Sequence, residues 1–316
     1  MVAFPKSDLP VEKDSHVPVL AKEILHWIRA LYEKDEWIVI DCTVGTGLLA
    51  SRILDESGGK GKIIGVDRDV QVLEIARRTL APYGDRVRLV HGRFSQLPEL
   101  VREEGEGRIY GIVMDLGVSS VQLARAERGF SFLREGPLDM RMDPTQGPTA
   151  ADLLEQLNED ALQACLRIYG EERYARRIAR AIVRARHRHP IRTTTQLATL
   201  IEQSVPTSYR YSRIHCATRT FQALRILVNQ ELDELSAALP AAVEMLEPGG
   251  RICVISFHSL EDRIVKQTFR ALSSGPHPRL SILTKKPSRP DREESMTNPR
   301  ARSAKLRVAE RVGEKV

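Results

Sequence analysis

The sequence contains few cysteines, few aromatic residues and no long apolar run. Its four cysteines lie far apart and form no Cys-x-x-Cys pair: Cys42, Cys165, Cys216 and Cys253. This spacing excludes a disulfide framework and a cysteine-based zinc site, so we expect a reduced compartment and no metal. No apolar stretch approaches the roughly 20 residues that a membrane-spanning helix needs. The polar first 15 residues do not resemble a secretory signal, so we expect a cytoplasmic protein without membrane contact.

The net charge of +6 is distributed unevenly along the chain. Between Arg173 and Arg225 there are 12 arginines and one acidic residue, Glu202, which gives this segment a charge of +11. Residues 276–316 carry +6, so the rest of the chain carries −11. A polyanion would meet the arginine-rich segment first. We therefore favour a nucleic acid as partner over a merely solvated basic surface.

Short apolar segments alternate with helical ones over the first 115 residues. Apolar, β-branched runs predict strands at residues 37–43, 62–67, 87–91 and 109–115. Helical spacing occurs between them, and Asp69 is a suitable N-cap for a helix over residues 69–80. This alternation is typical of βαβ units, so we predict an α/β fold with a parallel sheet.

The alternation stops after Asp115. Residues 117–148 are rich in Gly, Ser, Pro and Arg, which predicts a long loop, and residues 150–204 have a helical pattern. We therefore predict an inserted helical, arginine-rich domain over residues 126–218. Residues 1–125 and 219–316 together would form the sheet domain.

The last part of the chain returns to the sheet pattern. We predict one long helix at residues 220–246, a fifth strand at 251–257, a partly mobile loop at 274–303 and two edge strands at 281–284 and 305–309.

Gly45 and Gly47 follow the first predicted strand in a Gly-x-Gly-x-x-Ala pattern, which matches the dinucleotide-binding fingerprint. A helix that starts at Leu48 would direct free N–H groups, including that of Leu49, at a ligand over the turn. Asp67 ends the second strand, where an acid can accept hydrogen bonds from ribose hydroxyls. The pattern predicts a nucleotide-like cofactor at this turn.

Asp41 lies four residues before Gly45 and narrows the choice of cofactor. An acid at this position would repel a pyrophosphate and attract a cationic group. S-adenosylmethionine carries a sulfonium and an ammonium group, so the sequence favours it. A carboxylate that only caps the amides of the turn is equally compatible with the sequence.

Asp115 ends one predicted strand and His258 follows another, at the sheet edge that faces a ligand in open α/β folds. A polar group there can accept hydrogen bonds from a target amine, whose lone pair is otherwise delocalised into the ring. Asp115 is our candidate catalytic residue, either as that acceptor or as a group that holds the cofactor. We consider His258 as a substrate contact, with a hydrogen bond that orders the loop as its alternative.

Aromatic and arginine residues suggest where a nucleic acid would bind. Arg128, Phe130 and Phe132 lie just past Asp115 and suit an extruded base and its phosphates, although the aromatic rings could instead anchor the loop. Arg177 and Arg184 lie on the predicted basic helix face, where we expect contact with phosphates.

Nine short motifs throughout the chain match one known family. They are His16-Val-Pro-Val-Leu20, Asp41-Cys-Thr-Val-Gly45, Asp115-Leu-Gly-Val-Ser-Ser120, Glu127-Arg-Gly-Phe-Ser-Phe132, Gly136-Pro-Leu-Asp-Met-Arg-Met-Asp-Pro144, Gly170-Glu-Glu-Arg173, Ala217-Thr-Arg-Thr-Phe-Gln222, Ile255-Ser-Phe-His-Ser-Leu-Glu-Asp-Arg263 and Asn298-Pro-Arg-Ala-Arg-Ser303. In these motifs the chain resembles bacterial 16S ribosomal RNA (cytosine-N4) methyltransferases of the RsmH or MraW type.

The resemblance implies a class I S-adenosylmethionine-dependent methyltransferase fold, Rossmann-like, with a helical substrate domain inserted after the fourth strand. It implies N4-methylation of a cytosine in the decoding region of 16S ribosomal RNA, within the small ribosomal subunit. The family's cofactor positions fall on Gly47, Asp67, Phe94, Asp115 and Gln122, with Phe94 against the adenine. The oligomeric state is not fixed by the sequence, and a homodimer stays open.

One departure from the family concerns the glycine turn. The family usually continues this turn as Gly-Gly-His, whereas this chain has Gly47-Leu48-Leu49. Backbone N–H groups of Leu48 and Leu49 can still serve the cofactor, but a histidine side chain could not contribute.

Three alternatives remain at this stage. The glycine pattern alone would also suit an NAD-dependent dehydrogenase. A DNA amino-methyltransferase usually has Pro-Pro-aromatic after the strand-four acid, which Leu116-Gly117-Val118 does not match. Leu48 and Leu49 give some support to a non-catalytic assembly factor of the small subunit with a vestigial pocket.

Overall fold

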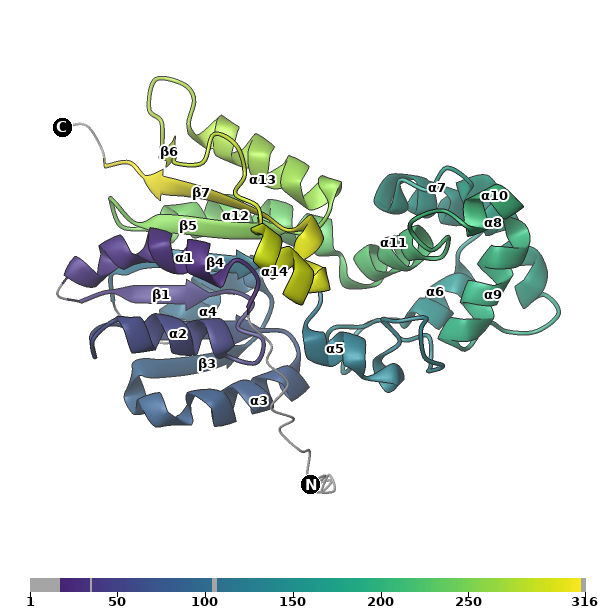
Figure 1. Ribbon diagram of the computed structural model, residues 1–316, viewed down its shortest axis with the longest axis horizontal. Coiled ribbons are helices and arrows are strands. Elements are labelled where there is room, and N and C mark those ends of the chain that lie inside the picture. The colour runs from purple at the N-terminus through teal and green to yellow at the C-terminus, as the bar shows by residue number, and fades with distance from the viewer. Residues whose placement is uncertain (1–17, 35, 104–106, 314–316) are drawn as a thin grey trace.

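The computed structural model describes residues 18–34, 36–103 and 107–313, and it contains a sheet domain beside a helical domain (Figure 1). The polar start of the chain lies outside these ranges. Within these ranges, seven strands form one sheet in the order β3-β2-β1-β4-β5-β7-β6. The parallel ones are β1 (Ile38–Asp41), β2 (Lys62–Asp67), β3 (Val87–His91), β4 (Ile109–Asp115) and β5 (Arg251–Ser256). The predicted parallel sheet is therefore confirmed.

Two short antiparallel strands complete one edge of the sheet. The strand β7 (Lys305–Arg311) pairs with β5, and β6 (Leu280–Ile282) pairs with β7. The predicted edge strands are therefore confirmed.

The prediction of a partly mobile loop at residues 274–303 is wrong in part. The segment contains α14 (Arg292–Thr297) and a 3-10 helix (Pro299–Ser303). The Asp291 side chain accepts a hydrogen bond from the Glu294 N–H at 2.7 Å and caps α14. The Glu294 carboxylate accepts from the Leu20 N–H at 2.8 Å, so the segment is tied to the start of α1.

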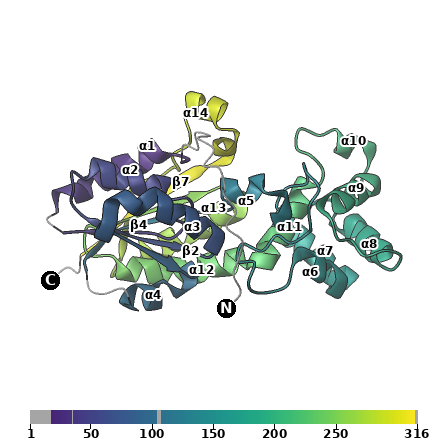
Figure 2. The ribbon, with the colours of Figure 1, turned by 90° about the horizontal axis from the view of Figure 1, so that it is seen from below.

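Helices cover both faces of the sheet (Figure 2). One face packs against α1 (Ala21–Ile28), α2 (Leu48–Glu56) and α3 (Val70–Leu80), and the other against α4 (Leu97–Glu103), α12 (Glu231–Met245) and α13 (Ser259–Leu272). Val39 belongs to the first apolar core and its neighbour Ile40 to the second. Burial on both faces explains why these strands are continuous apolar runs in the sequence.

The helical domain lies between β4 and α12 in the chain and beside the sheet domain in space (Figure 1). Its helices are α5 (Ser120–Ala124), α6 (Ala150–Gln156), α7 (Glu159–Gly170), α8 (Ala175–Arg186), α9 (Thr194–Ser204), α10 (Thr207–Arg210) and α11 (Thr218–Asn229). A third apolar core, which includes Leu166, Ile178 and Leu197, belongs to this domain alone. No helix within the described residues has the length and apolarity that crossing a membrane requires.

The single long helix predicted at residues 220–246 is wrong. The chain breaks at Gln230, whose φ is 53°, and forms α11 and α12 instead. Phe221 and Leu224 of α11 pack in the core of the helical domain. The packing thus favours a domain boundary after Asn229 rather than at residue 218.

Candidate cofactor pocket and active site

The carboxyl ends of the parallel strands face the helical domain (Figure 1). Residues at these strand ends line a cavity of about 1070 Å³. Its wall includes most of the cofactor residues predicted from the sequence: Gly45, Leu48, Leu49, Asp67, Phe94, Asp115 and Gln122. Asp41 and Thr43 line it as well. Parallel strands end at one edge of the sheet, so residues far apart in the chain meet there.

The two glycines of the turn have different roles. Gly45 has a φ of 56°, lines the cavity and donates its N–H to Asp67 Oδ2 at 3.0 Å. Gly47 has a φ of 83°, but it is buried and is not part of the cavity wall. A Cβ at Gly47 would lie 2.9 Å from the Leu80 side chain on α3. Gly47 allows α2 and α3 to pack closely, and its predicted direct contact with a cofactor has no support in this geometry.

The first turn of α2 presents backbone donors to the cavity. The first hydrogen bond in this turn runs from the Ser51 N–H to the Gly47 carbonyl at 2.9 Å. The amides of Leu48 and Leu49 precede it, so they have no partner within the helix. The Leu49 side chain packs in the apolar core between α2 and the sheet. The Leu49 side chain therefore does not close the cavity.

Asp67 ends β2 and is held by two backbone donors. Its Oδ2 accepts from the Gly45 N–H and its Oδ1 from the Asp69 N–H, each at 3.0 Å. Burial raises the pKa of Asp67 to about 6 in spite of these hydrogen bonds. The carboxylate is fixed in position and still has acceptor capacity for ligand hydroxyls.

Asp41 and Asp115 are buried acids at the ends of β1 and β4. Burial raises the pKa of Asp41 to about 7 and that of Asp115 to about 8, and the charge of Asp41 contributes to the rise at Asp115. The Asp115 N–H donates to Thr43 Oγ1 at 2.7 Å. Asp115 Oδ1 is buried and has no hydrogen-bond partner among the described residues. It is therefore available to accept a hydrogen bond from a bound molecule.

This arrangement suits a cofactor with a positive charge. Asp41, Asp67 and Asp115 all line the cavity, and each loses stability when ionised in the absence of a cation. A sulfonium or ammonium group would offset these charges, whereas a pyrophosphate would be repelled. The donors of α2 and the Asp115 Oδ1, which no described residue bonds, add polar groups, so the residues present fit S-adenosylmethionine.

Phe94 and Gln122 complete the group of cofactor residues predicted from the sequence. Phe94 begins a short 3-10 helix (Phe94–Gln96) after β3 and lines the cavity while half-buried. Gln122 lies in α5, and its Nε2 donates to Asp69 Oδ2 at 2.9 Å. Gln122 also lines the cavity, so it joins the pocket to the start of α3.

His258 has a different position from the one we predicted. It is not part of the cavity wall; instead its Nδ1 accepts from the Glu261 N–H at 3.4 Å and caps α13. Its Nε2 lies 3.0 Å from Glu261 Oε1. The geometry contradicts a direct substrate contact through His258 and matches its alternative, a hydrogen bond that orders the loop.

Three residues that the sequence reasoning missed line the same cavity as Asp115: Arg225, Glu231 and Glu261. Arg225 donates to both oxygens of Glu231 at 2.8 Å. Glu231, Glu261 and His258 come close enough to hold a metal ion, but the guanidinium already supplies positive charge there. The position of Glu261, three residues after a helix-capping His258, is the sequence signal that could have identified it.

The segment that contains Arg128, Phe130 and Phe132 packs in the interior rather than facing a nucleic acid. Arg128 pairs with Asp69 in the interior, and its guanidinium lies 5.8 Å from the centroid of the buried Phe130 ring. Phe132 stacks on His215, with ring centroids 4.6 Å apart. The burial of Arg128 and Phe130 contradicts the predicted RNA contact, and Phe132 is engaged in packing the helical domain.

Arg177 and Arg184 are exposed on α8, opposite Ile178 and Ile182, which are buried. The helix lies on the far side of the helical domain from the sheet (Figure 1). The predicted amphipathic pattern is confirmed, and the contact of these arginines with RNA stays a prediction.

Comparisons with known proteins identify the family. The model of the MraW methylase family matches residues 13–312. The ribosomal RNA small subunit methyltransferase H of Heliobacterium modesticaldum is 46% identical over 311 residues, which cover 94% of this chain and 98% of the relative. That of Thermobifida fusca is 45% identical over 312 residues, with 95% and 94% covered.

Two solved structures show a weaker likeness. The SAM-dependent O-methyltransferase from Thermotoga maritima is 12% identical, with a TM-score of 0.39, and covers 94% of this chain and 66% of that chain. TrmN from Thermus thermophilus is 10% identical, with a TM-score of 0.42, and covers 93% of this chain and 48% of that chain.

The family match spans nearly the whole described chain and agrees with the resemblance seen in the sequence. It confirms the class I methyltransferase fold and S-adenosylmethionine as cofactor, and it removes the dehydrogenase alternative. The chain belongs to the MraW methylase family.

Proposed function

We propose that this protein transfers a methyl group from S-adenosylmethionine to the exocyclic N4 of a cytosine in the decoding region of 16S ribosomal RNA, within the small ribosomal subunit. The names of its relatives support the RNA substrate. The observation that carries the chemistry is the buried Asp115 Oδ1 at the end of β4, which has no hydrogen-bond partner in the part of the chain that the structure describes and lines the same cavity as Asp41.

The residues of the cavity would hold the cofactor in a fixed orientation. Asp67 would accept the ribose hydroxyls, Phe94 would lie against the adenine, and the amides of Leu48 and Leu49 would donate to polar groups above the turn. Asp41 would face the cationic end. When bound, the cofactor supplies an electrophilic methyl group.

Asp115 would act on the cytosine amine. The amine lone pair is delocalised into the ring, so it attacks poorly until its nitrogen becomes pyramidal. Asp115 Oδ1 would accept a hydrogen bond from the amine, which favours the pyramidal form, and would take up the proton that the amine loses. The cationic cofactor would favour the ionised form of Asp115, and the pKa of about 8 that burial gives this carboxyl makes the carboxylate basic enough to take up that proton.

The helical domain would bind the RNA. Arg177 and Arg184 are exposed on a strongly basic helix, and phosphates are the ligands that such a surface attracts. Because α8 lies away from the sheet, these arginines would hold parts of the RNA remote from the target cytosine. A ribosomal substrate would place the enzyme in the cytoplasm. Native mass spectrometry would test whether the protein forms a homodimer.

Analysis of small-subunit RNA tests this function directly. In cells that lack the protein, we expect mass spectrometry of 16S RNA to show the loss of one methyl group on a cytosine of the decoding region. Wild-type protein should restore it, and the Asp115→Ala variant should not, although it should still bind the particle. Unchanged methylation in the deletion strain would refute the proposal.

A further inference from the structure

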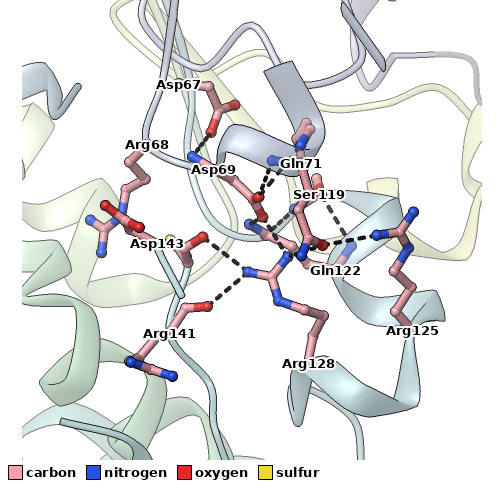
Figure 3. Close-up of polar contacts among 12 residues, drawn as sticks. Asp67, Arg68, Asp69, Gln71, Ser119, Gln122, Arg125, Arg128, Arg141 and Asp143 are labelled. Carbon is pink, nitrogen blue, oxygen red and sulfur yellow. Dashed lines mark hydrogen bonds and ion pairs between the residues drawn. The ribbon is translucent and has the colours of Figure 1, made fainter. Parts of the chain in front are cut away.

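A buried polar network joins the cofactor pocket to the helical domain (Figure 3). Arg128 follows α5, and its Nη1 donates to Asp69 Oδ2 at 2.7 Å. Arg128 is 4% exposed and Asp69 0% exposed. Burial of an ion pair costs hydration that its attraction barely repays, so a gain in stability does not account for this pair.

Asp69 connects this ion pair to Asp67. The Asp69 N–H donates to Asp67 Oδ1 at 3.0 Å. Asp69 Oδ1 caps α3 by accepting from the Gln71 N–H at 3.0 Å, and its Oδ2 accepts from Gln122 as well as from Arg128. A change in the position of Asp69 therefore moves a donor that orients the Asp67 carboxylate.

The other side of Arg128 is fixed to the helical domain. Its Nη2 donates to the carbonyls of Arg141 and Met142, each at 2.9 Å. The Met142 N–H donates to Asn229 Oδ1 at 2.8 Å, and Arg68 donates to the same oxygen at 2.8 Å. Both residues that follow Asp67 in the chain are thus bonded to the network that holds the helical domain.

We propose that Arg128 is a positioning residue for the cofactor: through Asp69 it orients the Asp67 carboxylate toward the ribose. The inference rests on the proposed function, because it requires Asp67 to accept the ribose hydroxyls. Arg128 is not part of the cavity wall, and its direct link to the residues that hold Asp67 is the ion pair with Asp69. It also offsets the charge of Asp69, which raises the pKa of Asp67 in addition to burial.

Calorimetry with two ligands separates positioning from general support of the fold. S-adenosylhomocysteine carries both ribose hydroxyls, and its 2′,3′-dideoxy analogue carries neither. The wild-type protein should bind the first more tightly. In Arg128→Ala we expect the affinity for S-adenosylhomocysteine to fall about tenfold, because hydrogen bonds to a charged acceptor are weakened. The affinity for the dideoxy analogue should hardly change, so the preference for the hydroxyls is lost.

Two further variants serve as controls. Arg125 donates to Gln71 Oε1 at 2.9 Å, near the same end of α3, but it does not bond Asp69. Arg125→Ala should therefore leave both affinities unchanged. Arg128→Lys keeps a positive donor for Asp69 and should restore most of the preference for the hydroxyls.

The ratio of the two affinities decides the outcome. An equal loss for both ligands in Arg128→Ala, or no loss for either, would overturn the proposal. If Arg128→Ala does not fold, Arg128→Gln is measured by the same ratio, since its amide can still bond Asp69 without the charge. A wild-type protein that binds neither ligand would refute the proposed function instead. Equal wild-type binding of both ligands would refute the role of Asp67 and this proposal with it.

Discussion

The two domains of this protein use charge in opposite ways. At the carboxyl edge of the sheet, the carboxylates of Asp41 and Asp67 accept hydrogen bonds from backbone N–H groups, and the backbone N–H of Asp115 donates to Thr43 Oγ1. On α8, Arg177 and Arg184 are exposed and form no ion pair among the described residues. A buried charge interacts strongly with a single neighbouring group because water does not screen it. Exposed charges are screened, so their attraction for a polyanion is the sum of many weak interactions.

This difference indicates how each domain contributes to recognition. The pocket depends on a few residues whose positions are fixed, so single changes should have large effects. The helical domain spreads its attraction for RNA over many arginines, so single changes should have small effects that depend on salt. Protonation of the buried acids should change the affinity for the cofactor. Ionic strength should change the affinity of the basic surface for RNA.

The Asp115→Asn variant should show the largest effect of a single change in the pocket. Asparagine still accepts a hydrogen bond but cannot take up the amine proton, so methyl transfer should slow by about a thousandfold. Affinity for S-adenosylmethionine should fall by no more than about threefold, because one of the carboxylates that face the sulfonium is neutralised. Single-turnover methylation of purified small subunits and calorimetry measure the two effects. Asp55→Asn, on the exposed surface of α2, is the matched control. A parallel loss of cofactor affinity would indicate that Asp115 holds the cofactor.

Stability should separate a buried arginine from an exposed one. Arg128→Ala leaves the Asp69 carboxylate buried without its cation, so the free energy of unfolding should fall by about 3 kcal/mol. Arg177→Ala should change it by less than about 0.5 kcal/mol. Urea denaturation measures both. Similar losses in the two variants would contradict the contrast between the domains.

Charge reversal on α8 should affect RNA binding alone. In the double variant Arg177→Glu, Arg184→Glu, we expect affinity for the small subunit to fall about tenfold and its dependence on salt to weaken, because phosphate contacts are lost. Cofactor affinity should stay the same. Filter binding at several salt concentrations measures this, with Arg102→Glu on α4 as the control. If RNA binding does not change, the basic face is only a solvated surface.

The smallest expected effect is a dependence of cofactor affinity on pH. The raised pKa values of Asp41 and Asp115, about 7 and about 8, mean that both carboxyls lose their protons as the pH rises from 6 to 9. Ionised carboxylates attract the sulfonium, so S-adenosylmethionine should bind about threefold more tightly at the higher pH. S-adenosylhomocysteine, which lacks the sulfonium, should show a weaker trend in calorimetry. Identical trends would indicate that these acids do not face the sulfonium.

Local sequence patterns predicted the elements around the pocket well. Asp69 caps α3 as its position before an apolar helical pattern indicated, and the strand runs predicted β1 to β5 because burial on both faces requires continuous apolar residues. The break at Gln230 could not be predicted in this way. No Gly or Pro marks it, and Arg68, far away in the chain, bonds the Asn229 carbonyl there.

Side-chain direction was the main source of error at the site. Arg128, Phe130 and His258 were predicted to contact the substrate, but none of them lines the cavity. Their partners decided whether they face a ligand or the interior, and Asp69, which holds Arg128, lies 59 residues earlier in the chain. Thr43 and Glu261 reach the cavity for a similar reason, since strand ends far apart in sequence meet at one edge.

The sequence by itself determined the α/β alternation, the glycine turn, the basic helix and the family. The spacing of apolar residues, the residues that form turns and the short motifs are all local properties of the chain. Only the tertiary structure decided which charges are buried and paired. A carboxylate or guanidinium is stable in the interior only when distant segments bring donors or an opposite charge to it, and no short stretch of sequence contains that information.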